Sequence, residues 1–306
     1  MSLFRKAERR KAKLRLAITG TAGSGKTYGA LLVAQGLGGR IAMLDSENGS
    51  GDLYSNLCDY DILPLKAPYD IRKYLSAIHE AEKEGYSVII IDSLSHAWSG
   101  EGGLLDVKEQ LASNGKLNSF TAWNKITPMQ NKLIEAILTS PSHIIATIRS
   151  KTDYVQVIND RGKAEIRKVG LAPIQRPEIE YEFSVVMDLS SDHIVSVSKD
   201  RTSLFDNQNF MLSKEVGEKL LEYLNSGVEV VDEKTLNERK SALYHSYLKL
   251  FQDTPQEAQR LAQEAIMSVT GGRGSKDWTV QDLNNLEADV QNRINNVIHE
   301  ELAQAS

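Results

Sequence analysis

The sequence holds a single cysteine and no long apolar run. Cys58 is alone among 306 residues, which excludes an intrachain disulfide bond and any metal site that needs several cysteines. No stretch approaches the roughly twenty consecutive apolar residues that a membrane-spanning helix requires. The first fifteen residues are basic and lack the apolar segment of a signal peptide. These absences predict a cytoplasmic protein that does not contact a membrane.

Charge is unevenly distributed along the chain, whose formal net charge is −5. Residues 1–15 carry seven basic side chains and one acidic one, whereas residues 227–306 carry eight basic and thirteen acidic ones. We therefore expect a basic N-terminal arm over residues 1–13. Such an arm can hold a phosphate backbone or an acidic neighbour, and it is equally compatible with a solvated helix.

Strands and helices alternate from residue 14 onward, which predicts an α/β core over residues 14–226. The run at 88–91 is β-branched throughout, and a strand that is apolar on both faces belongs in a buried parallel sheet. We expect a mostly parallel central sheet that binds ligands at the carboxyl ends of its strands. The predicted strands are 14–19, 40–45, 87–92 and 143–148, and the predicted helices are 28–37, 70–84 and 129–139.

The pattern changes after residue 150. Residues 153–169 alternate apolar and polar side chains around a turn at 159–162, which indicates a β-hairpin or a mobile loop. A break at 225–227 ends the core, and residues 227–306 are predicted to form a small helical region. The other predicted elements are strands 181–189 and 193–199 and helices 214–225 and 280–303.

Residues 20–27 fit the pattern G-x4-G-K-[ST] without deviation, between an apolar strand and an apolar helix. Glycines let the backbone turn tightly with its N–H groups aimed at a phosphate, and the following helix adds its positive N-terminus. Lys26 is expected to reach the β- and γ-phosphates, and the Thr27 hydroxyl to bind magnesium. The sequence therefore predicts a site for ATP and Mg²⁺. The phosphate loop consists of Gly20, Thr21, Ala22, Gly23, Ser24, Gly25, Lys26 and Thr27.

Two carboxylates follow neighbouring predicted strands. Asp92 ends the strand at 87–92, where it can hold the magnesium ion through water, although an aspartate at a strand end is often only a turn former. Glu47 lies just after the strand at 40–45. A carboxylate there can activate the attacking water, or it can be a polar loop residue without chemistry.

These pieces resemble the RecA-like P-loop NTPase core of recombinases: a phosphate loop, then the segment Asp45-Ser46-Glu47, then an apolar run that ends in Asp92-Ser93. The resemblance implies that Glu47 is the catalytic base and that the strand around Thr147 carries the sensor of the γ-phosphate. It also implies that Lys199 and Arg201 reach the ATP of a neighbouring subunit, so that the protein assembles with itself as a ring or filament.

A narrower resemblance covers about residues 12–210. The stretches 95–98, 122–128, 148–154 and 199–202 are similar to phage-encoded AAA-type nucleotide-binding proteins, among them the RecA-like single-strand annealing ATPases of the Sak group. This likeness implies an ATPase of phage recombination in the host cytoplasm. Its implied partners are single-stranded DNA and a single-strand binding or annealing protein.

The loops at 93–125 and 149–176 correspond to those that line the DNA path in RecA-like proteins. The second is rich in basic side chains and holds an aromatic residue that can stack on a base. Contact with a neighbouring subunit is the alternative role of this segment. The candidate nucleic-acid contacts are Arg149, Lys151, Tyr154, Arg161, Lys163, Arg167 and Lys168.

The function predicted from the sequence is an ATP-hydrolysing RecA-like protein that acts on single-stranded DNA in annealing or strand exchange. A replicative helicase or helicase loader with the same core is one alternative. The other is an ATP-gated switch that binds a partner protein without contacting DNA. The C-terminal helices are compatible with partner binding, with oligomerisation and with a small bundle packed on the core.

Overall fold

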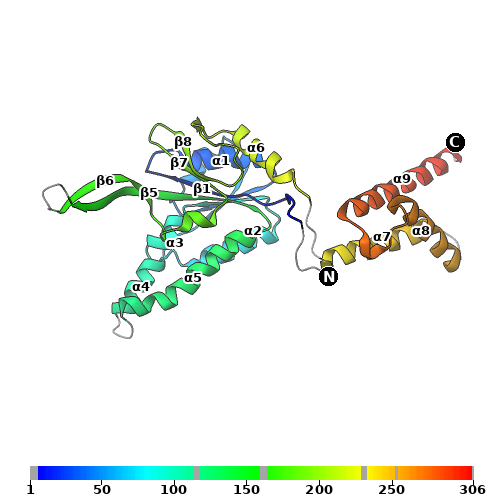
Figure 1. Cartoon of the computed structure of the whole chain (residues 1–306), viewed down its shortest axis with the longest axis horizontal. Helices are drawn as coiled ribbons and strands as arrows, with labels where there is room; N and C mark the ends of the chain where they lie inside the picture. The colour runs from blue at the N-terminus through cyan, green and yellow to red at the C-terminus, as the bar shows by residue number, and fades with distance from the viewer. Residues whose placement is uncertain (1–5, 114–117, 159–163, 229–232, 252–253, 305–306) are drawn as a thin grey trace. The chain divides into compact units, whose positions relative to one another are not determined.

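A computed structural model describes residues 6–113, 118–158, 164–228, 233–251 and 254–304 (Figure 1). The chain divides into two compact units. One comprises residues 12–227, and the other comprises the described residues up to Lys11 together with those from Val228 onward. No helix in the described ranges is long and apolar enough to cross a membrane.

The larger unit is built on a sheet to which the described residues contribute nine strands, in the order β3-β2-β4-β5-β1-β7-β8-β9, with β6 paired to β5. The strands from β3 to β7 in this order run parallel, and β6, β8 and β9 run antiparallel to their neighbours. This confirms the predicted α/β fold with a mostly parallel sheet. The strands are β1 (Arg15–Gly20), β2 (Ile41–Asp45), β3 (Asp61–Pro64), β4 (Val88–Asp92), β5 (His143–Ile158), β6 (Ala164–Pro173), β7 (Val185–Leu189), β8 (Ile194–Asp200) and β9 (Phe210–Met211).

Helices cover both faces of this sheet, as Figure 1 shows. Side chains of β4 alternate between two cores: Val88 and Ile90 face one, and Ile89 and Ile91 face the other. Burial on both faces explains why the run at 88–91 is apolar throughout. The first core is closed by α1 (Lys26–Leu37) and α6 (Lys214–Asn225), and the second by α2 (Ile71–Lys83), α3 (Leu94–Ser99), α4 (Leu104–Ser113) and α5 (Ser119–Thr139).

The segment after residue 150 is a hairpin. Strand β5 continues past the core sheet and pairs antiparallel with β6 from Ser150 to Ile158, so that the two strands extend away from the rest of the unit (Figure 1). The hairpin prediction is therefore confirmed. The strand predicted at 181–189 begins only at Val185, because Ile179–Glu182 forms a 3₁₀ turn.

The second unit contains α7 (Glu233–Leu250), α8 (Pro255–Thr270) and α9 (Val280–Gln304). Their shared core includes Tyr247, Ala262 and Leu286. Its N-terminal part is extended: Arg10 forms a β-bridge with Val228, and the described residues 6–14 contain no helix. The solvated helix considered for the basic arm is therefore not present in that part.

Candidate functional site

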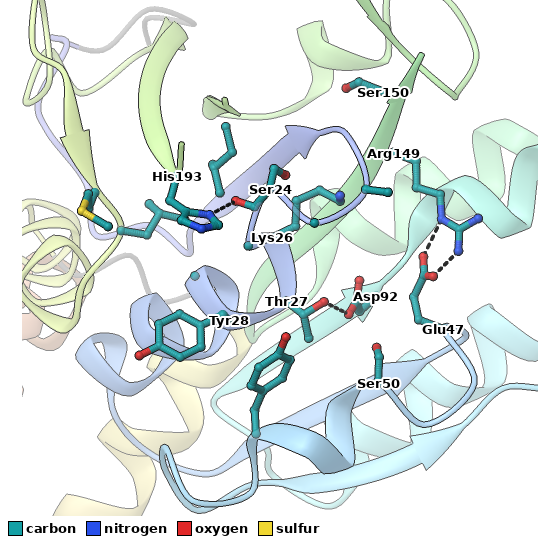
Figure 2. A pocket seen from close by; sticks show the side chains of 18 of the residues that line it. Ser24, Lys26, Thr27, Tyr28, Glu47, Ser50, Asp92, Arg149, Ser150 and His193 are labelled. Carbon is teal, nitrogen blue, oxygen red and sulfur yellow. Dashed lines mark hydrogen bonds and ion pairs between the residues drawn. The ribbon is translucent and has the colours of Figure 1, made fainter. Parts of the chain in front are cut away.

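A pocket of about 830 Å³ lies over the phosphate loop at the carboxyl ends of the parallel strands (Figure 2). Sequence positions far apart converge there: the loop between β1 and α1, the loop after β2, the end of β4, and the middle of β5, where that strand leaves the core sheet. The predicted residues Lys26, Thr27, Glu47 and Asp92 all line it. The topology thus brings together the groups that the sequence placed at one sheet edge.

The phosphate loop has the backbone that its glycines allow. Gly23 and Gly25 have φ angles of +76° and +88°, in the region that residues with a Cβ rarely adopt. The Lys26 Nζ donates to the carbonyl of Thr21 at 2.7 Å. Burial lowers the pKa of Lys26, while Asp92 and Glu47 act in the opposite direction. The lysine is therefore held at the loop and within reach of an anion in the pocket.

Asp92 is buried at the centre of the site, with 1% of its surface exposed. It accepts a hydrogen bond from Thr27 Oγ1 at 2.6 Å and another from the hydroxyl of Thr147. Burial raises the pKa of Asp92, and the two hydroxyls oppose that effect. Thr147, the predicted sensor, is fully buried beneath this carboxylate and does not line the pocket.

Thr27 and Asp92 fit a magnesium ion that is shared with a nucleotide. Both offer hard oxygen donors at one point, and Mg²⁺ is usually held by one or two carboxylates plus phosphate oxygens and water. Among the described residues, no group of three or more His, Cys, Asp and Glu side chains could hold a metal ion. The residues present thus suit a magnesium ion brought with the phosphates, rather than one held by the protein alone.

Glu47 is paired with Arg149 inside the pocket (Figure 2). Arg149 Nε donates to Glu47 Oε1 at 2.7 Å, and its Nη2 donates to Oε2. Burial acts to raise the pKa of Glu47, but hydrogen bonds from Arg149 and Ser93, with the charges of Arg149 and His96, outweigh it, and the net pKa is lowered. Arg149 was predicted as a DNA contact, and the structure places its side chain in the lining of this pocket.

Ser46 links the segment after β2, which carries Glu47, to the end of β4, which carries Asp92. Ser46 N–H donates to the carbonyl of Asp92 at 2.7 Å, and Ser46 Oγ accepts from Ser93 N–H at 2.8 Å. His96 Nδ1 lies 2.8 Å from the same hydroxyl, and burial, followed by the charge of Arg149, lowers the pKa of His96. Sequence reasoning assigned His96 no role, since a lone histidine carries no spacing signal.

His193, Tyr28 and Tyr54 are among the pocket residues that the sequence did not predict. His193 lies in the β7–β8 turn, and its Nδ1 is 3.0 Å from the carbonyl of Ser24 in the phosphate loop. Tyr28 and Tyr54 meet edge to face, with ring centroids 5.7 Å apart, at another part of the pocket lining. The positions of Tyr54 and His193 depend on the paths of the segments after β2 and β7, which local sequence does not reveal, whereas Tyr28 follows the phosphate loop directly in α1 and could have been predicted.

Lys199 and Arg201 lie away from this pocket in their own chain. Both donate to the backbone carbonyl of Tyr181, Lys199 at 2.6 Å and Arg201 at 3.3 Å. Lys199 pairs with Val186 near the start of β7, whereas the end of β7, at Leu189, pairs with Gly20 of the phosphate loop. The two cations therefore lie near the amino-terminal ends of the parallel strands, whereas the phosphate loop lies at their carboxyl ends.

Four other predicted nucleic-acid contacts, Lys151, Tyr154, Arg167 and Lys168, belong to strands β5 and β6. Lys151 is exposed on β5. Tyr154 and Lys168 are register partners, as are Val155 and Arg167, and only their backbone is described. Arg161 and Lys163 lie outside the described residues.

A family model described as "AAA domain" matches residues 12–216, which include the phosphate loop, both acidic strands and the hairpin. No curated protein matches the chain.

Proposed function

This chain belongs to the AAA domain family, and we propose that it is a RecA-like ATPase that acts on single-stranded DNA. The observation that carries the ATPase part is the convergence of Lys26, Asp92 and Glu47 on one pocket. Phosphoryl transfer needs little covalent chemistry from a protein, since positioning and charge provide most of the catalysis. A lysine, a metal-binding carboxylate and a second carboxylate provide both.

In this proposal Lys26 and the loop N–H groups hold the β- and γ-phosphates, and Thr27 and Asp92 hold magnesium. Bound magnesium supplies positive charge at the phosphate oxygens. Glu47 orients a water molecule and accepts its proton while the water oxygen bonds to the γ-phosphorus. The bond from that phosphorus to the bridging oxygen breaks, and ADP leaves with the electron pair. Tyr28 and Tyr54 offer ring surfaces for the base.

We assign Lys199 and Arg201 to the ATP site of a neighbouring subunit in a ring or filament. Both lie away from the phosphate loop of their own chain: Lys199, which is half-buried, is near the end of β8, and Arg201, which is exposed, follows that strand. A cation supplied by a neighbour neutralises the charge on the transferring phosphoryl group. ATP turnover would then depend on assembly.

The DNA part of the proposal rests on the β5–β6 hairpin and on the sequence resemblance to RecA-like recombinases. The β5–β6 hairpin extends from the ATPase core and carries a basic sequence, and basic loops hold phosphates without reading bases. The substrate class is single-stranded DNA, with a recombination role of the kind that phages encode beside single-strand binding or annealing proteins.

The test is steady-state ATP hydrolysis with and without single-stranded DNA, on the wild-type protein and on Glu47→Gln and Lys26→Ala. We expect DNA to stimulate hydrolysis and both variants to be inactive. Strand displacement coupled to hydrolysis would favour a helicase over an annealing protein. Hydrolysis that ignores DNA, with no DNA retained in ATP, would leave a partner-binding switch. No hydrolysis and no nucleotide binding would overturn the proposal.

A further inference from the structure

Arg149 is hydrogen-bonded to the Glu47 carboxylate, which is the group that hydrolysis would use as its base. Both carboxylate oxygens accept from the guanidinium, one of them at 2.7 Å. The Glu47 side chain is only 19% exposed and that of Arg149 is 44% exposed, and both line the pocket. In this state Glu47 is engaged with a cation at the place where it would have to meet a water molecule.

The backbone of Arg149 is held on both sides. Its N–H donates to Ser95 Oγ at 2.9 Å, and its carbonyl accepts from Ile174 N–H at 2.6 Å. It is also in register with Gly20 at the end of β1. A change of partner at this residue is therefore a rotation of the side chain, with the strand left in place.

A terminal phosphate would compete for this guanidinium. Lys26 and Arg149 are the lysine and arginine side chains that line the pocket in the described part of the chain. Lys26 Nζ donates to a carbonyl of the phosphate loop, whereas Arg149 reaches the pocket from β5 with 44% of its side chain exposed, so its guanidinium has room to turn toward a phosphate. A γ-phosphate carries more negative charge than a carboxylate, and it can accept the same bidentate pair of hydrogen bonds from a guanidinium.

We propose that Arg149 binds the γ-phosphate of ATP and, in its absence, keeps Glu47 engaged. With ATP present, the guanidinium turns from the carboxylate to the phosphate oxygens, and Glu47 becomes free to accept a proton from water. ADP has no such phosphate and leaves the pair closed. This inference rests on the proposed function, because it places both residues in an ATP site.

The electrostatics of the pair agree with this assignment. Burial acts to raise the pKa of Glu47, but hydrogen bonding to Arg149 and Ser93 and the charges of Arg149 and His96 together lower it. The pairing thus makes the carboxylate a weaker base, and departure of the guanidinium restores its basicity. One movement both recognises the substrate and activates the group that uses it.

The experiment measures binding of ADP and of a β,γ-imido ATP analogue to the full-length chain by calorimetry with Mg²⁺. We expect Arg149→Ala to weaken analogue binding by roughly 10- to 100-fold, the range for a lost charge-assisted pair, and to change ADP binding by less than about 3-fold. Arg149→Lys should recover part of the loss. Arg72→Ala is the matched control, because it removes an exposed pair with Asp70 away from this pocket.

A double-mutant cycle separates the gate from simple repulsion between Glu47 and phosphate. We expect Glu47→Gln to tighten analogue binding in the wild-type background and to have little effect in the Arg149→Ala background. Equal tightening in both backgrounds, or an Arg149→Ala effect that is the same for ADP and the analogue, would overturn the inference and leave the ATPase proposal intact. A wild-type protein that binds neither nucleotide would overturn both.

Discussion

His143 is a buried histidine whose protonation opposes folding. It is 5% exposed, and its Nδ1 accepts a hydrogen bond from Leu14 N–H at 3.0 Å, so the folded chain needs the neutral ring. Burial, with Lys13 and Arg15 nearby, lowers its pKa from 6.5 to about 4. Between these two values the unfolded chain binds more protons than the folded one. Stability is thus complete above pH 6.5 and falls toward pH 4, by up to about 3 kcal/mol.

The measurement is urea unfolding at pH values between 7.5 and 4.5. Unfolding is monitored through the fluorescence of Trp98 and Trp123 in a protein that carries Trp278→Phe. His143→Asn keeps an acceptor for Leu14 but does not titrate in this range, so its stability should fall less steeply. His79→Asn replaces an exposed histidine and is the control. Parallel pH curves for wild type and His143→Asn would contradict this prediction.

Thr147 offers a second prediction at the residue scale. Its hydroxyl donates to Asp92, and Thr147 itself is fully buried and does not line the pocket. Groups that orient a metal ligand typically contribute 10- to 100-fold in metal affinity or activity. We expect Thr147→Val to raise the Mg²⁺ concentration for half-maximal ATP hydrolysis by roughly 10-fold or more, and Thr147→Ser to stay near wild type.

Thr139→Val is the matched control, since the Thr139 hydroxyl bonds only to a carbonyl of its own exposed helix turn. An unchanged Mg²⁺ requirement in Thr147→Val would show that its hydroxyl does not orient Asp92.

The sequence could indicate which strand carries such a residue but not which position faces the pocket. That depends on strand register. Arg149 pairs with Gly20 at the end of β1, and Thr147 pairs with Ile18, two residues farther into the sheet.

At the scale of elements, α1 and α6 approach closely through two glycines. A Cβ on Gly217 would lie 2.1 Å from the Val33 carbonyl oxygen, and one on Gly36 would lie 2.0 Å from the Lys214 carbonyl oxygen. The obstructing atoms are backbone and cannot rotate away. We expect Gly217→Ala to lower the stability of the 12–227 unit by about 1–3 kcal/mol, as overpacking does.

Thermal or urea unfolding measures this effect, with Gly274→Ala as the control. Gly274 has a negative φ of −69°, and nothing lies within 4 Å of its added Cβ. A Gly217→Ala protein as stable as wild type would mean that the two helices can separate without loss of packing.

Helix α5 shows what local sequence could not predict at this scale. The sequence predicted a helix over residues 129–139 only, which begins just after Pro128, and proline usually breaks a helix interior. The structure instead carries α5 through Pro128, from Ser119 to Thr139. Its buried face explains this: Ala122, Ile126, Leu133 and Ile137 continue one stripe on both sides of the proline. Tertiary burial outweighs one lost backbone hydrogen bond, while the apolar strands and the phosphate loop were clear from local pattern.

At the scale of the whole chain, long-range pairing is what the sequence hides. The break at 225–227 was visible from its composition. The pairing of Arg10 with Val228, which joins the N-terminal segment to the C-terminal unit, joins residues more than two hundred positions apart and has no local signature. The same limit applies to the ATP site, whose strands meet only through the sheet order β2-β4-β5-β1.

Assembly gives the last prediction. If Lys199 and Arg201 complete the site of a neighbour, a Lys26→Ala subunit still offers its cations, and a Lys199→Ala/Arg201→Ala subunit still binds ATP. Each variant alone should lose roughly 10³-fold in hydrolysis, the usual effect of losing such a cation or the phosphate-loop lysine. Mixed in equal amounts and allowed to reassemble, they should recover up to about a quarter of wild-type activity, because one interface in four pairs two intact halves.

The control is a mixture of Lys26→Ala with the triple variant Lys26→Ala/Lys199→Ala/Arg201→Ala, in which no interface is complete and no recovery is expected. Lys199 and Arg201 also bond to the Tyr181 carbonyl, so circular dichroism must show that the double variant remains folded. Recovery in the first mixture alone requires an ATP site shared between two chains. Full activity of the double variant by itself would instead mean that each chain completes its own site.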